Sequence, residues 1–262
     1  MSCDILGQMQ NIIWEGDTPH EHYQVVDTLY DGRPARVLYS GNQQAAQSGI
    51  AQDTNPDLLF DYNQRFLELA SGLKPERVLV IGGGAFTLPQ ALLHALPNTS
   101  IDAVELDAKL VELSRRYFHL PDSSRLHIYT SDGRTFLREY HVQYDMVIID
   151  AFMHTTIPRE LKTLQAFLAY REHVVEEQGV VAMNVISGYH GVRSSTLRQV
   201  YAAAQQTFDT VDVMLASYGN SLWLPQNFVL VGQRGQKLPV GDYMRYEAVS
   251  PLTVSPDIAL RD

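Results

Sequence analysis

The sequence predicts an α/β protein in which a doubly wound, mostly parallel sheet follows a small N-terminal antiparallel β subdomain. Three observations support this prediction. Apolar runs of strand length alternate with helical patterns from about residue 77 onward. Most of these runs are continuously apolar, as strands buried on both faces of a parallel sheet are. Glycines and acidic residues follow several runs directly, which is typical of the ligand-binding edge of a Rossmann-like sheet.

The composition excludes several classes of protein. The chain has 262 residues with 20 Lys and Arg against 30 Asp and Glu, a net charge of −10, and 45% of its residues are hydrophobic. This apolar content predicts a folded protein, and the acidic balance disfavours nucleic acid as a partner. The single cysteine, Cys3, excludes a disulfide framework. No apolar run approaches the roughly 20 residues that span a bilayer, and no signal-peptide pattern opens the chain. We therefore expect a cytoplasmic protein with no membrane partner.

Residues 1–54 are expected to form the N-terminal β subdomain. Two segments of strand character flank an Asp31-Gly32 turn, and a polar turn is expected at residues 40–42. Such a small sheet is not stable alone and must pack on the main domain or on a second copy of the chain.

Residues 55–235 are expected to form the sheet domain, and residues 236–262 a loosely attached polar tail. The domain begins with a helix expected over residues 55–73, with Asn55 as its N-cap. Strands and helices alternate beyond it. Strands are expected at 77–81, 100–107, 126–132, 144–152, 179–186, 210–217 and 227–233, and helices at 88–96, 108–118, 134–140, 161–174 and 196–208.

A glycine triplet and an acidic residue on the next strand predict a nucleoside site. Gly82, Gly83 and Gly84 follow the first strand of the domain, where glycine lets a ligand approach the backbone closely. Glu105 ends the second strand, about 20 residues further on, where a carboxylate can accept both ribose hydroxyls. Asp107 follows it and has an alternative role as the N-cap of the next helix.

Two further strand ends complete the pattern. Asp132 and Gly133 follow the third strand, where the carboxylate can accept from the exocyclic amine of adenine, although Asp132 can also act as an N-cap. Asp150 ends the fourth strand. Acidic residues after three successive strands, behind a glycine-rich loop, indicate an adenosine-type ligand.

The chain resembles the spermidine synthase (polyamine aminopropyltransferase) family, whose fold is of the class I S-adenosylmethionine-dependent methyltransferase type. The similarity lies in VLVIGGG, VELD, SDGRTFL and YDMVIIDAF, in that order, and covers roughly residues 20–235. Gln24 lies in a Tyr-Gln pair similar to one in the family, and residues 46–62 resemble the segment that leads to its active-site tyrosine. Residues 157–161 are similar to those of a spermidine synthase-like branch of the family.

The resemblance implies transfer of an aminopropyl or other alkyl group to a small-molecule amine acceptor. The donor would be S-adenosylmethionine or decarboxylated S-adenosylmethionine, and no metal is implied. Asp150 would be the base that accepts a proton from the amine, with Tyr62 orienting it or the acceptor. Gln24, the three glycines, Glu105, Asp132 and Gly133 would bind the donor. The family also implies a homodimer.

Two positions depart from the family pattern. Ala85 stands where the family has an acid that holds the amine of the donor, and Met153 stands where it has an acid that helps to hold the diamine. An ammonium buried without a partner is costly. We therefore expect putrescine to be a poor acceptor and decarboxylated S-adenosylmethionine to lose its advantage as donor.

Other functions remain open on the sequence. A methyltransferase that uses S-adenosylmethionine would tolerate Ala85, and a non-catalytic nucleoside-binding protein could keep the same fold. A dinucleotide oxidoreductase is disfavoured, because Phe86 and Thr87 interrupt the GxGxxG pattern. His154, Tyr189 and His190 follow strand ends and are weaker candidates for the acceptor pocket. No paired histidine motif indicates a metal site.

Overall fold

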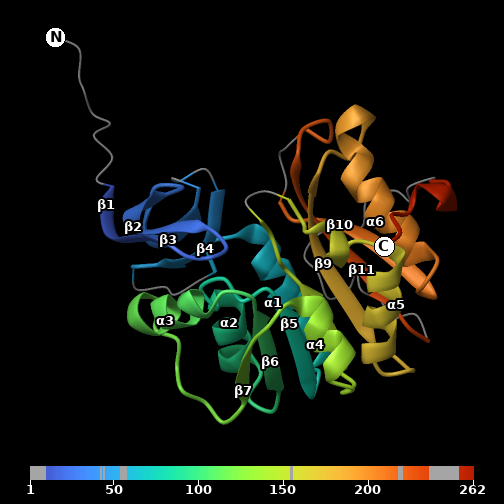
Figure 1. Ribbon diagram of the computed structural model, residues 1–262, viewed down its shortest axis with the longest axis horizontal. Helices are drawn as coiled ribbons and strands as arrows, with labels where there is room; N and C mark the ends of the chain where they lie inside the picture. The colour runs from blue at the N-terminus through green and yellow to red at the C-terminus, as the bar shows by residue number, and fades with distance from the viewer. Residues whose placement is uncertain are drawn as a thin grey trace.

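The computed structural model describes residues 10–41, 43, 45–53, 58–153, 156–217, 221–235 and 254–262. Its first unit is a four-stranded antiparallel sheet in the order β1-β2-β3-β4, which forms a separate lobe in Figure 1. Asp31 and Gly32 join two of these strands, and both have positive φ, as the two-residue hairpin turns of twisted strands require. The strands are β1 (Asn11–Asp17), β2 (His22–Tyr30), β3 (Arg33–Ser40) and β4 (Ala45–Ala51).

The second unit is a seven-stranded sheet in the order β10-β11-β9-β8-β5-β6-β7. Five neighbouring strands are parallel, and β11 and β10 extend the sheet antiparallel beyond β9. The central strands are buried along their length, which explains their continuous apolar character. The strands are β5 (Arg77–Ile81), β6 (Ser100–Glu105), β7 (Leu126–Thr130), β8 (Met146–Ile149), β9 (Val180–Ser187), β10 (Thr210–Leu215) and β11 (Gln226–Gln233).

Helices cover both faces of this sheet, as in a doubly wound fold. Apolar side chains of α1 and α2 pack with one set of strand residues, and those of α4, α5 and α6 pack with another. Helix α3 packs through its leucines on the N-terminal sheet as well. The helices are α1 (Asp61–Leu73), α2 (Thr87–Ala95), α3 (Ala108–Tyr117), α4 (Gly133–Glu139), α5 (Leu164–His173) and α6 (Ser195–Gln205), with short 3-10 turns η1 (Arg159–Leu161), η2 (Gly191–Ser194) and η3 (Pro256–Ile258).

The predicted fold class and strand alternation are confirmed, and two local predictions need correction. Helix α1 begins at Asp61, not at residue 55, and Leu58, three residues before it, forms an isolated antiparallel bridge with Ile50 of β4. Asn55, its expected N-cap, lies outside the described residues, as does the boundary expected at 54 and 55. Residues 254–262 are not a loose tail, because Ala259 is buried in the main core.

The carboxyl ends of β5 and β8 meet where the order of strands reverses. Parallel sheets bind ligands at such a point. Gly82 follows β5 with φ +97°, and a Cβ there would lie 2.4 Å from the carbonyl oxygen of Asp150 and 2.8 Å from the Cα of Ala151. Only glycine fits this approach of two backbones.

Replacing Gly82 with alanine should therefore destabilise the protein more than the same change at Gly32. Gly32 also has positive φ, +79°, but nothing lies within 4 Å of a Cβ built there. The left-handed backbone alone costs about 1–2 kcal/mol, and crowding at Gly82 should add about 1–3 kcal/mol. Urea unfolding of the two variants measures the difference. Equal loss of stability would contradict the close approach.

Candidate active site

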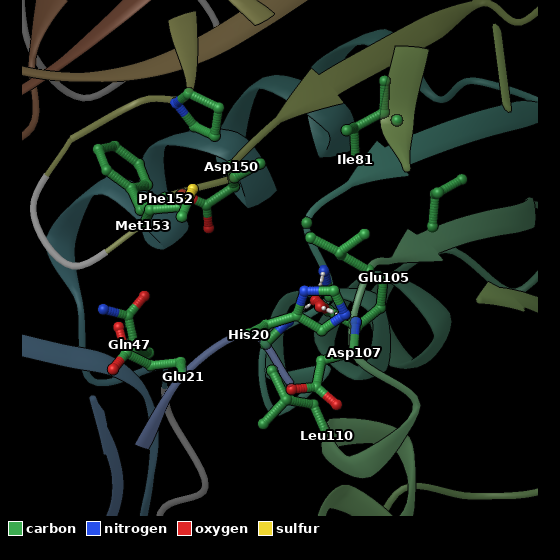
Figure 2. A pocket seen from close by; sticks show the side chains of 18 of the residues that line it. His20, Glu21, Gln47, Ile81, Glu105, Asp107, Leu110, Asp150, Phe152 and Met153 are labelled. Atoms are coloured by element: carbon green, nitrogen blue, oxygen red, sulfur yellow. Dashed lines mark hydrogen bonds between the residues drawn. The ribbon is translucent and has the colours of Figure 1, made fainter. Parts of the chain in front are cut away.

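A cavity lies at the carboxyl ends of β5, β6, β7 and β8 and is closed on another side by the N-terminal sheet. Figure 2 shows Asp150, Phe152 and Met153 on one side and His20, Glu105 and Asp107 on the other. We call this the first cavity. Its lining comprises His20, Glu21, Tyr23, Ser40, Gln47, Ser48, Ile81–Gly84, Val104–Asp107, Leu110, Ser131–Gly133, Asp150–Met153, Pro158, Glu160 and Leu161.

The glycine loop after β5 is held in an unusual backbone conformation. Gly84 has φ +51° and Phe86 has φ +57°, a left-handed conformation that bulky residues rarely adopt. The ring of Phe86 lies directly under Gly83, where a Cβ would be 2.6 Å from its Cζ atom. From the N-terminal sheet, the Ser48 hydroxyl accepts from the Ala85 N–H at 3.1 Å. The two units of the fold therefore shape this loop together.

Glu105 fastens the same loop to β6. One carboxylate oxygen accepts from the N–H groups of Gly83 and Gly84, at 2.8 and 2.9 Å, and the other accepts from the Asp107 N–H at 2.9 Å. The side chain is 8% exposed. Burial raises the pKa of Glu105, and these backbone hydrogen bonds oppose that rise. Its carboxylate thus organises the loop as well as lining the cavity.

Asp107 and Asp132 both act as N-caps, the alternative role given for each, and both also line the first cavity. Asp107 Oδ1 accepts from the Lys109 N–H at 2.9 Å, and Asp132 Oδ1 accepts from the Thr135 N–H at 2.9 Å. Asp107 Oδ2 is buried and has no hydrogen-bond partner among the described residues. It is therefore an acceptor that a ligand hydroxyl could satisfy.

Asp150 is the centre of a partly buried chain of polar side chains. Asn184 Nδ2 donates to Asp150 Oδ1 at 3.0 Å, and Asn227 Nδ2 donates to Asn184 Oδ1 at 2.9 Å. The Tyr62 hydroxyl forms a further hydrogen bond with Asp150, and burial raises the pKa of that tyrosine well above its usual value. Burial also raises the pKa of Asp150 to about 7, although the hydrogen bonds from Asn184 and Tyr62 lower it.

A second cavity adjoins the first and shares Gln47, Asp150 and Phe152 with it. The N-terminal sheet, the start of α1 and the carboxyl ends of β8 and β9 surround it. Asp150 therefore borders both cavities. The lining residues are Tyr30, Asp31, Ala46, Gln47, Leu59–Tyr62, Asp150, Phe152, Asn184, Ile186, Ala216, Ser217 and Asn227.

Several predicted residues lie elsewhere. Gln24 does not line either cavity, because successive side chains of β2 alternate and Tyr23 is the one that faces the first. The Gln24 amide donates instead to Glu15 at 2.8 Å. Tyr189 is buried in the main core and His190 contacts Trp223, and neither lines the first or the second cavity. His154 lies outside the described residues.

The two departures from the family pattern have unequal positions. Ala85 is 1% exposed and packs among apolar residues between the N-terminal sheet and α3, so it does not line the first cavity. Met153 lines that cavity and is 53% exposed. An acid at position 85 would therefore enter an apolar cluster.

Sequence reasoning missed Asn184, Gln47 and Ser48. Asn184 had a detectable signal, because it is a single amide within a continuously apolar strand, where buried polar groups need partners. The other two belong to β4, and their closeness to the glycine loop depends on how the two sheets pack. Among the described residues, no His, Cys, Asp or Glu group of three or more could hold a metal ion. In that same part of the chain, no helix has the length and apolar character to span a membrane.

Comparison with known proteins agrees with this geometry. A model of the spermine/spermidine synthase domain matches residues 63–224, and the chain belongs to that family. A polyamine aminopropyltransferase of Vibrio vulnificus (strain CMCP6) is 32% identical over 133 residues, which are 49% of this chain and 44% of that protein. The match thus spans less than half the length of that relative.

Two further similarities are to a solved structure and to a methyltransferase. The crystal structure of a probable spermidine synthase from Corynebacterium glutamicum ATCC 13032 superposes with a TM-score of 0.76 at 18% identity, covering 91% of this chain and 90% of that one. The human eEF1A lysine and N-terminal methyltransferase is 24% identical over 192 residues, which are 69% of this chain and 25% of that protein.

Glu105 should be needed for both the loop and the ligand. Replacing it with alanine leaves three N–H groups without their acceptor, and we expect a loss of about 1–3 kcal/mol in the free energy of unfolding. Methylthioadenosine should also bind more than about tenfold more weakly, since a charged hydrogen-bond partner is worth about 1.5–3 kcal/mol. Urea unfolding and calorimetry measure the two effects. Unchanged affinity in a folded variant would remove Glu105 from the site.

Proposed function

We propose that this protein transfers an aminopropyl or related alkyl group from a sulfonium nucleoside to an amine. The nucleoside donor occupies the first cavity, with the glycine loop, Glu105, Asp132 and Gly133 around it. The amine acceptor occupies the second cavity. The observation that supports this best is the position of Asp150, a partly buried carboxylate that borders both cavities.

The chemistry requires a base at this point. As the acceptor nitrogen attacks the carbon next to the sulfonium, a C–N bond forms and a C–S bond breaks. Sulfur leaves as a neutral thioether nucleoside, and Asp150 accepts the proton that the nitrogen loses. Asn184 and Tyr62 hold the carboxylate in place through their hydrogen bonds. The Asp150 pKa of about 7 suits a base that works near neutral pH.

Activity should therefore rise with pH through the pKa of Asp150. Below a pH of about 7 the carboxyl is protonated and cannot accept a proton, so kcat/KM should fall about tenfold per pH unit. Asp150→Asn should lower turnover by about 10²–10⁴-fold while methylthioadenosine still binds. Asp122→Asn, an exposed control, should behave as the unchanged protein. Turnover by Asp150→Asn near the original rate would refute the proposal.

The second cavity favours a cationic acceptor. Its lining holds three carboxylates, those of Asp31, Asp61 and Asp150, and no Lys, Arg or His among the described residues. Aromatic rings lie between the acids: Tyr30 and Phe60 are 5.3 Å apart at their centroids, and Phe60 and Tyr62 are stacked at 5.9 Å. Asp31 follows Tyr30 in the chain, and Tyr62 bonds to Asp150. The rings of Tyr30, Phe60 and Tyr62 therefore form an apolar path between the carboxylates of Asp31 and Asp150.

This path changes the expectation for the acceptor. Weak use of a diamine was expected from Ala85 and Met153, but Ala85 does not reach the first cavity and neither residue lines the second. We propose that Asp31 and Asp61 supply charge for the distal ammonium of the acceptor, and that Phe60 and Tyr62 accommodate its methylene chain.

The double variant Asp31→Asn with Asp61→Asn should discriminate diamines from monoamines. We expect KM for putrescine to rise about tenfold or more, as for a lost charged partner, while KM for a monoamine of equal length changes little. Steady-state kinetics with both amines measures this. Asp53→Asn is a control acid of the N-terminal unit that does not line the cavity. Equal effects on both amines would exclude a distal charge contact.

Methyl transfer is the second candidate, favoured by the similarity to a protein lysine methyltransferase. Incubation of one preparation with S-adenosylmethionine and with its decarboxylated form distinguishes the two activities by the mass of the product. The homodimer, the cytoplasmic location and the domain boundaries stay predictions.

A further inference from the structure

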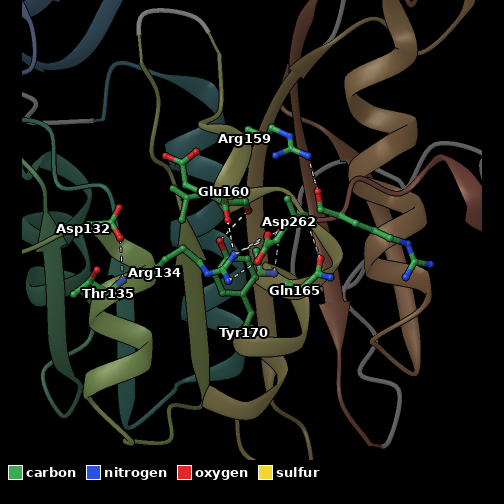
Figure 3. Close-up of polar contacts among 12 residues, drawn as sticks. Asp132, Arg134, Thr135, Arg159, Glu160, Gln165, Tyr170 and Asp262 are labelled. Carbon is green, nitrogen blue, oxygen red and sulfur yellow. Dashed lines mark hydrogen bonds and ion pairs between the residues drawn. The ribbon is translucent and has the colours of Figure 1, made fainter.

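Arg134 extends away from the first cavity, directly after two residues that line it. Its Nη1 atom donates to the carbonyl oxygen of Glu160 at 2.8 Å, and its Nη2 atom pairs with Asp262 at 3.0 Å (Figure 3). Helix α4 begins at Gly133, and Glu160 belongs to η1. One guanidinium thus joins two separate parts of the cavity wall.

The segment 254–262 holds that guanidinium through Asp262, on the side away from the first cavity. The Asp262 carboxylate accepts from the Thr163 hydroxyl at 2.6 Å as well as from Arg134. The Leu260 carbonyl accepts from the Leu164 N–H at 2.7 Å, and the Arg261 carbonyl accepts from Arg159 at 2.6 Å. These contacts reach both ends of the turn that contains η1.

The same turn presents its side chains to the first cavity. Glu160 and Leu161 line it, while their carbonyl oxygens accept from Arg134 and from the Tyr170 hydroxyl, the latter at 2.9 Å. A Cβ at Gly133 would lie 3.5 Å from Leu161 Cδ2, so η1 and the start of α4 are in contact. The backbone is thus held from outside and the side chains face the ligand space.

We propose that Arg134, fixed by Asp262, is a positioning residue that sets donor affinity by holding the η1 side of the first cavity. The inference rests on the proposed function, because it assigns the nucleoside donor to that cavity. Arg134 does not line the first cavity and acts on the donor through the residues that do. The partners are partly exposed, with 27% of the Arg134 and 44% of the Asp262 side chain accessible, so the pair adds little to global stability.

Arg134→Met and Asp262→Lys test this inference, with Arg171→Met as the matched control. Arg171 likewise donates to a backbone carbonyl, of Thr207 at 2.6 Å, and pairs with a partly exposed acid, Asp209, at 3.3 Å, but it lines neither cavity. Calorimetry should show methylthioadenosine binding about fivefold more weakly to both test variants, a typical effect for residues that act through neighbours. The control should bind normally, and Arg134→Lys should recover part of the loss.

Two further measurements separate positioning from other roles. Donor KM should rise in Arg134→Met with kcat nearly unchanged, and amide exchange at Leu161 and Lys162 should accelerate there but not in Arg171→Met. Unchanged affinity in both test variants, or weaker binding without faster exchange, would overturn the inference. If the unaltered protein fails to bind methylthioadenosine, the proposed function fails, and the exchange comparison still decides whether Arg134 restrains the turn.

Discussion

The contact between the ends of β5 and β8 determines where every other part of the site can lie. The Gly82 N–H donates to the Val104 carbonyl of β6 at 2.9 Å, and the Asp150 backbone N–H donates to the Ile81 carbonyl of β5 at 2.8 Å, so the ends of three neighbouring strands are joined by hydrogen bonds. A side chain at Gly82 would separate the strand end that carries Asp150 from the glycine loop. The absence of a Cβ at one residue thus lets Asp150 and the glycine loop lie next to each other.

The N-terminal sheet completes both cavities. Ser48 contributes a hydrogen bond to the glycine loop, Tyr23 lines the first cavity, and Tyr30 and Asp31 line the second. A parallel sheet alone offers only an open crevice at its carboxyl edge. The N-terminal sheet divides that crevice into two adjoining cavities.

The sequence predicted the fold and the strand-end acids well, because these depend on local periodicity and spacing. Glu105, Asp132 and Asp150 line one cavity, as their spacing indicated, and Tyr62 bonds to Asp150, as the family resemblance implied. It could not predict that Gln24 points away, since a side chain's face on a strand depends on register. Nor could it show that Ala85 is buried or that Asp262 reaches Arg134, because both depend on contacts between distant segments.

The three backbone hydrogen bonds to Glu105 also bear on the thermodynamics of binding. A carboxylate exposed to water must shed its solvent when a ligand arrives, whereas that of Glu105 is already desolvated and fixed in the folded protein. The cost of ordering the loop is met during folding, and little conformational entropy remains to be lost on association. Nucleoside binding should consequently be close to lock-and-key, with the rate of dissociation, and not a slow rearrangement, governing how long the complex lasts.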